Sequence, residues 1–124
     1  SGVRPMHHLF PRAAVAKLKD DRFACFVVGD YRDPKGFYRD FVSETISAFV
    51  RAGTKLYNEA ILVTAVGSLP IRVGKQFAAS RKLGKTHQFC LVFVKCDPKK
   101  ATQACGAVEV DEALFEPDQA KIDM

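Results

Sequence analysis

The chain has 124 residues, of which 48% are hydrophobic and 27% are charged, and its formal net charge is +5. This length suits one domain with its own core, and this composition excludes a chain that is disordered throughout. Because no apolar run could span a bilayer and residues 1–20 lack the order of a signal peptide, we expect a cytoplasmic protein. We expect a folded core over residues 11–106 and an acidic tail over residues 107–124.

The first half of the sequence predicts a helix, a strand and a second helix. Residues 11–20 carry proline in their first turn, which is typical of a short helix. The run FACFVV at residues 23–28 is continuously apolar, which is typical of a strand that is buried on both faces in a parallel sheet covered by helices. From Tyr38 to Phe49 apolar residues recur at helical spacing, and Gly53 follows where a C-cap is expected.

The second half predicts two strands around a long connection. Residues 56–66 and 89–94 have the β-branched and aromatic content of strands. The connection between them is too long for an ordinary loop, so we expect a short helical turn near residues 75–80. A last helix should begin at Asp97-Pro98 and end near Gly106. The expected fold class is α/β, with helices that flank about three strands.

Charge is distributed unevenly in this half. Residues 72–85 hold five basic residues and no acidic one, whereas residues 107–124 hold six acidic residues. The basic segment is either a solvated face or a surface that meets a polyanion, and Ser80 and Thr86 are suitable donors to phosphate oxygens. The candidate DNA-binding residues are Arg72, Lys75, Arg81, Lys82, Lys85 and His87.

Two stretches resemble catalytic or phosphate-binding elements. ASRKLGKT at residues 79–86 fits a permissive phosphate-binding loop, but such a loop must open a helix, and a predicted strand follows here, so we interpret the match as coincidence. Asp30 and Asp33 flank the carboxyl end of the first predicted strand, where open parallel sheets build their sites. With Tyr31 and Arg32 they could serve acid–base chemistry or hold a ribose; the alternative is a capping and ion-paired turn that leads into the helix.

The cysteines and histidines predict no metal site. Cys25, Cys90, Cys96 and Cys105 form no CxxC pair and have no histidine at zinc-ligand spacing. We expect them to be reduced and unpaired, with Cys25 and Cys90 acting as small hydrophobic residues. The sequence carries no local signature of a nucleophilic triad and no glycine-rich dinucleotide loop, so no catalytic or cofactor-binding residue is predicted.

Five blocks of the sequence resemble the C-terminal half of amino-group (N6-adenine or N4-cytosine) DNA methyltransferases, in particular those of phages and mobile elements that are sometimes fused to a ParB-like domain. The blocks are FACFVVGDYRD at 23–33, GFYRDFVSETI at 36–46, LYNEAILVT at 56–64, GSLPIR at 67–72 and SRKLGKTHQ at 80–88. The resemblance covers residues 12–115. The sequence departs from the family at Phe89-Cys90, where Asn-Val is usual, and at Cys96, where glycine is usual.

The resemblance also implies what this chain lacks. The family binds S-adenosylmethionine on a glycine-containing loop and grips the flipped base with a Pro-Pro-Tyr motif, and neither motif occurs here. We therefore expect no cofactor and no catalysis by this chain alone, and residues 30–33 would be a vestigial cleft. S-adenosylmethionine would bind only if a partner chain supplied the missing half.

The resemblance further implies an arrangement of strands. The family places its last three strands at one side of a seven-stranded sheet, with the final strand antiparallel and inserted between its neighbours. Residues 23–28, 56–66 and 89–94 would be these strands, and the strand at 23–28 would have a bare edge. We expect self-association through that edge or its flanking helices, which buries on the order of 1,000 Å² or more in total.

Three hypotheses follow. The first is a catalytically inactive half-domain, derived from a DNA methyltransferase, that self-associates and binds DNA through the basic segment. The second is the target-side subunit of a split methyltransferase that a partner chain completes. The third is a folded remnant with no selected function.

Overall fold

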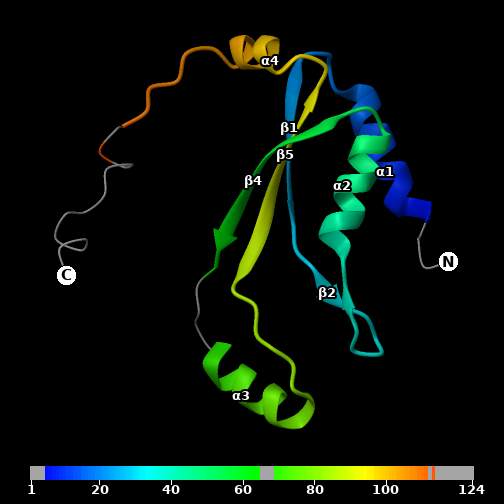
Figure 1. The fold of residues 1–124 in the computed structure, drawn as a ribbon, viewed down its shortest axis with the longest axis vertical. Helices are drawn as coiled ribbons and strands as arrows, with labels where there is room; N and C mark the ends of the chain where they lie inside the picture. The colour runs from blue at the N-terminus through cyan, green and yellow to red at the C-terminus, as the bar shows by residue number, and fades with distance from the viewer. Residues whose placement is uncertain (1–4, 65–68, 112, 114–124) are drawn as a thin grey trace.

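Three strands form an antiparallel sheet in the computed structural model, which describes residues 5–64, 69–111 and 113 (Figure 1). The strands are β1 (Arg22–Val28), β4 (Lys55–Val63) and β5 (His87–Lys95), and their order is β1-β5-β4. β5 therefore lies between the other two and is antiparallel to both, as the resemblance predicted. The parallel sheet that we predicted from the apolar run at 23–28 is wrong for the described strands, since every pairing among them is antiparallel.

Four helices and a small hairpin complete the described structure, which confirms the α/β class. The helices are α1 (Pro5–Lys17), α2 (Phe41–Arg51), α3 (Leu69–Ser80) and α4 (Pro98–Cys105), and the hairpin pairs β2 (Tyr31–Arg32) with β3 (Tyr38–Arg39). α4 has the predicted start, since the Asp97 side chain accepts a hydrogen bond from Lys99 N at 2.9 Å. α3 is a full helix of 12 residues rather than a single turn.

Two predicted helix starts are wrong. α1 begins before Pro11, which lies inside the helix and not in its first turn. The second helix begins at Phe41 and not near Tyr38, which lies in β3. Two carboxylates fix this start, because the side chain of Asp40 accepts from Ser43 N at 3.3 Å and that of Asp30 accepts from Val42 N at 2.8 Å. Acceptors at these positions satisfy amides that lack partners in the first turn of a helix.

The core lies between one face of the sheet and helices α1 and α2. This helix-covered face carries side chains of β1 and β5 that alternate along each strand: Ala24, Phe26, Val28, Phe89, Leu91 and Phe93. The ring of Phe93 stacks on that of Phe49 from α2, with a centroid separation of 4.5 Å and an interplanar angle of 16°. Val15 of α1 is buried in the same cluster. Lys95 stabilises the C-terminal end of α1, because its Nζ donates hydrogen bonds to Val15 O at 2.7 Å and to Leu18 O at 2.8 Å.

The opposite face of the sheet is covered only at one end. We call it the open face; it carries Cys25, Val27, Ala60, Leu62, Cys90 and Val92. α4 packs against one end of β1, where Ala101 is fully buried, and the rest of this face lacks a helix among the described residues (Figure 1). Val27 is therefore 50% exposed although it lies within the apolar run at residues 23–28. The prediction that this strand is buried on both faces is wrong for the described chain.

The sheet has two edge strands, β1 and β4, and β4 is exposed along its whole length. One side of β4 pairs with β5, and the described residues provide no strand for the other side. The exposed residues include Ile61, at 59%, and Val63, at 80%. The predicted strand extended to residue 66, and residues 65 and 66 lie outside the described part of the chain. No helix in the described part has the length and apolar character needed to cross a membrane.

Candidate nucleic-acid interface

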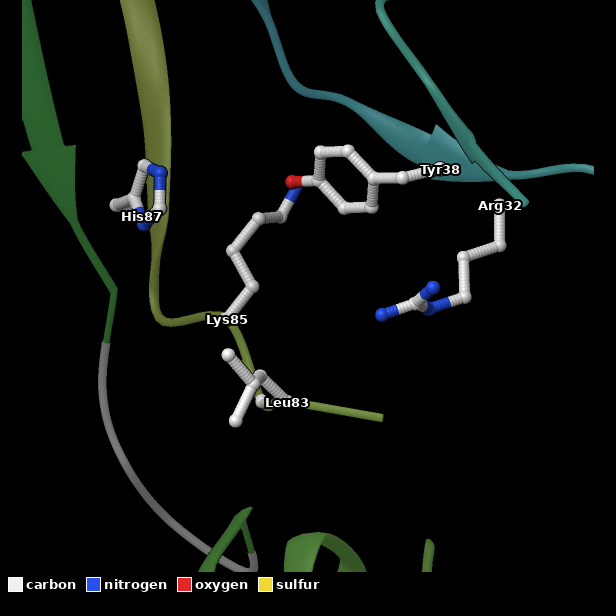
Figure 2. Close-up of a pocket in the computed structure, with 6 residues that line it drawn as sticks. Arg32, Tyr38, Leu83, Lys85 and His87 are labelled. Carbon is white, nitrogen blue, oxygen red and sulfur yellow. The ribbon is translucent and has the colours of Figure 1, made fainter. Parts of the chain in front are cut away.

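A pocket of about 330 Å³ lies beyond the carboxyl end of β1, next to the start of β5 (Figure 2). Its walls come from the β2–β3 hairpin, from the segment that joins α3 to β5 and from the first residue of β5. The residues that line it are Arg32, Tyr38, Leu83, Gly84, Lys85 and His87. Two segments that are about fifty residues apart in the sequence therefore meet at this end of the sheet.

Lys85 crosses the end of β1. Its Nζ donates a hydrogen bond to the backbone oxygen of Asp30 at 2.6 Å. Gly29 makes room for this approach, because a Cβ at residue 29 would lie only 2.8 Å from Lys85 Nζ. Figure 2 shows the side chain of Lys85 and the ring of Tyr38 extending toward one another. The ammonium group is thus held at the pocket by the fold rather than left to move freely.

Arg32 and Lys82 bring further positive charge to the same place. Arg32 Nη1 donates to Gly36 O at 3.0 Å, and its guanidinium carbon lies 5.3 Å from the centre of the Tyr38 ring. Lys82 Nζ lies 3.8 Å from the position that a Cβ would take at Gly36, so Lys82 approaches the turn of the hairpin. The ring of His87 packs edge-on against Phe89, with centroids 5.3 Å apart.

The carboxylates predicted as a cleft are occupied by backbone amides. Asp30 Oδ1 accepts from Val42 N, and Asp33 Oδ1 accepts from Lys35 N at 2.9 Å and from Phe37 N at 3.0 Å. These contacts match the capping turn that we gave as the alternative. Neither carboxylate lines the pocket, and the Tyr31 ring packs against Phe41 with centroids 5.6 Å apart. Of the four residues, Arg32 is the one that reaches the pocket.

The remaining candidate DNA-binding residues belong to α3 and its end. Lys75 is exposed on α3, and the side chain of Arg72 lies outside the described part. Arg81 Nη1 donates to Phe77 O at 2.8 Å and to Ala78 O at 2.9 Å, so its guanidinium caps the C-terminus of α3. Neither Lys75 nor Arg81 lines the pocket. The structure thus brings Lys82, Lys85 and His87 together with Arg32 and leaves the α3 residues apart from them.

The hairpin has a local signal in the sequence. The segment YRDPKGFYR at residues 31–39 places Asp-Pro-Lys-Gly, a turn-forming composition, between two Tyr-Arg pairs. The two pairs form β2 and β3, and this pairing places Tyr38 beside Arg32. The match to a phosphate-binding loop at 79–86 runs from the end of α3 into β5 and opens no helix. Among the described side chains, no group of three or more His, Cys, Asp or Glu residues could hold a metal ion.

Models of known protein families, curated proteins and solved structures were compared with this chain, and none of them matches it. The function must therefore be inferred from the charge and geometry of the chain itself.

Proposed function

We propose that this domain binds the phosphate backbone of DNA through the basic end of its sheet and catalyses no reaction by itself. We define the basic end as Arg32, Lys82, Lys85 and His87. The observation that carries the proposal is the composition of the pocket: Arg32, Lys85 and His87 are among its lining residues, and no carboxylate is among the described ones. Arginine, lysine and neighbouring backbone amides are the groups that most often hold DNA phosphates.

The positions of the charges favour an extended polyanion over a small anion. α3 lies beyond the same end of the sheet and carries Lys75, and Arg81 follows its last residue, so basic residues continue outside the pocket (Figure 1). The carboxylates of Asp30 and Asp33 do not line the pocket, and both are engaged by backbone amides, so they do not compete with a phosphate for the basic groups there. A DNA strand that follows the hairpin toward α3 would meet positive charge along its path.

The test is DNA binding measured by fluorescence anisotropy over a series of salt concentrations. The slope of log affinity against log salt is negative, and each lost phosphate contact makes it less steep by about 0.9. The double variant Lys82→Gln/Lys85→Gln should therefore make the slope less steep by up to about 2.

The matched control is Lys99→Gln/Lys100→Gln, which removes the same charge from exposed residues of α4 at the opposite end of the sheet (Figure 1). We expect this variant to keep nearly the affinity of the native chain. Equal losses from both variants would mean that net charge alone attracts DNA, and absence of binding at low salt would refute the proposal.

The strand order β1-β5-β4 supports descent from the amino-group DNA methyltransferases, because the inserted antiparallel strand is the arrangement that the resemblance implied. The same observation favours the second hypothesis, in which a partner chain supplies the S-adenosylmethionine site and completes a split enzyme. Calorimetry distinguishes both hypotheses, the inactive half-domain and the subunit of a split enzyme, from an enzyme that is complete in this chain. S-adenosylmethionine should give no heat of binding with this chain alone, and DNA methylation would appear only after a complementary half is added.

We also propose that the chain forms homo-oligomers through an exposed edge of the sheet. β4 is the better candidate than β1, since all nine of its residues are exposed. An exposed edge strand of this length presents unpaired amides and carbonyls to a second copy, which can continue the sheet. If neither DNA, a partner chain nor a second copy binds, the folded remnant is the hypothesis that stands.

A further inference from the structure

Two cysteines that are 65 residues apart in the sequence meet on the open face of the sheet. The Sγ atoms of Cys25 on β1 and Cys90 on β5 are 3.0 Å apart. Cys25 is exposed and Cys90 is half-buried, so small molecules can reach the pair from solvent. The register pairs Cys25 with Val92 and Val27 with Cys90, so the two cysteines are diagonal neighbours across the strands.

We propose that Cys25 and Cys90 form a reversible dithiol–disulfide site that exchanges with small disulfides of the glutathione class. The Cys25 thiolate attacks one sulfur of oxidised glutathione, which forms a mixed disulfide and releases one glutathione thiolate. The Cys90 thiolate then attacks Cys25 Sγ, which forms the internal disulfide and releases the second glutathione. The two protein thiols lose two protons and two electrons, and one oxidised glutathione becomes two reduced ones.

The geometry suits both the forward step and its reversal. The two Sγ atoms must approach by only about 1 Å to reach the length of a disulfide bond, about 2.05 Å. Diagonal neighbours in a sheet have Cα atoms about 7–8 Å apart, whereas disulfides usually span about 4.4–6.8 Å. The bond should therefore form with a small movement of the backbone and with some strain, and strained, exposed disulfides are the ones that reduced thiols open readily.

Cys96 and Cys105 provide internal references in the same chain. Both are exposed and free. With excess oxidised glutathione, they should accumulate as glutathione adducts, because no second thiol is placed to displace the glutathione. Cys25 and Cys90 should instead lose two hydrogen atoms and carry no adduct.

The experiment treats the reduced chain with oxidised glutathione and maps the products by mass spectrometry of non-reduced peptides. We expect a Cys25–Cys90 cross-link that reduced glutathione reverses. In Cys90→Ser the glutathione adduct on Cys25 should live at least about tenfold longer than in the native chain, because attack by a neighbouring thiol is lost. The double variant Cys96→Ser/Cys105→Ser should still form the cross-link.

Some outcomes would overturn the proposal. One is a native chain in which Cys25 keeps its glutathione adduct as long as Cys96 does. Another is a native chain in which all four cysteines cross-link without preference, as an unfolded chain would. Circular dichroism of each variant shows whether the fold is intact, and the double variant keeps the test valid if Cys90→Ser does not fold.

Discussion

Two neighbouring valines of β1 provide a direct test of the one-sided burial of the sheet. Val28 points into the helix-covered face and is 5% exposed, whereas Val27 lies on the open face and is 50% exposed. Replacing either one with alanine removes the same atoms from the same strand. Any effect of alanine on strand propensity is therefore similar in the two variants and largely cancels in the comparison.

The burial of each side chain sets the expected losses of stability. Removing two buried carbon groups from Val28 costs about 1.6 kcal/mol of transfer free energy, and the cavity left beside the core raises the total to about 2–3 kcal/mol. Val27 is half in solvent and leaves no cavity, so Val27→Ala should cost less than about 1 kcal/mol. Urea denaturation followed by circular dichroism measures both values from the shift of the midpoint.

Equal losses at the two positions would refute the inference that the open face is solvated in the isolated chain. The sequence alone predicted that outcome, because a strand buried on both faces loses a packed side chain at either position. If the losses are equal, repeating the measurement over a range of protein concentrations shows what covers the open face. If the cost of Val27→Ala rises with concentration, a second copy covers the open face; if it does not, another part of the same chain covers it.

Three further predictions follow from single contacts. Gly29→Ala should displace Lys85 Nζ from Asp30 without changing the net charge. DNA affinity in the anisotropy assay should therefore fall while the urea midpoint stays nearly constant. Unchanged affinity would show that the position of Lys85 is irrelevant to DNA binding. The pKa of Cys25 is raised above its ordinary value of 9.0, first by its hydrogen bond with Cys90, then by burial and by the charge of Cys90. Alkylation of Cys25 by iodoacetamide should therefore require a higher pH than alkylation of an ordinary thiol. Cys90→Ala should move this profile to lower pH, as peptide mass spectrometry would detect, and a profile that does not move contradicts the assigned cause. Sedimentation equilibrium should show concentration-dependent association that Leu62→Lys on β4 weakens, and a chain that stays monomeric throughout would disprove self-association.

Local signals in the sequence predicted most elements but not how far burial extends. The Asp97-Pro98 start of α4 and the strand at residues 89–94 were predicted correctly, since capping chemistry and β-branched content are local properties. The run at 23–28 led to a wrong prediction of burial on both faces. The hydrophobicity of a strand shows which side chains could be buried, but not whether another element covers them. Val27 is as apolar as Val28, and only the placement of α1 and α2 distinguishes them.

The pocket and the cysteine pair depend on contacts that no local pattern encodes. Lys85 reaches the oxygen of Asp30 because β1 and β5 are neighbours, and the same pairing brings Cys25 to Cys90. A prediction of strand order alone would not have been sufficient for the cysteines. A shift of the register by one residue would place the two thiols on opposite faces of the sheet.

The thiol pair can also distinguish between two modes of self-association. A second copy that pairs with the edge of β4 extends the sheet and leaves Cys25 as exposed as it is in one chain. A second copy that packs on the open face buries Cys25 and Cys90 together, and glutathione then loses access to both. Exchange at Cys25 should therefore keep the same rate at low and high protein concentration if association uses β4, as we propose. A rate that falls with concentration, while Cys96 and Cys105 react as before, would assign the interface to the open face instead.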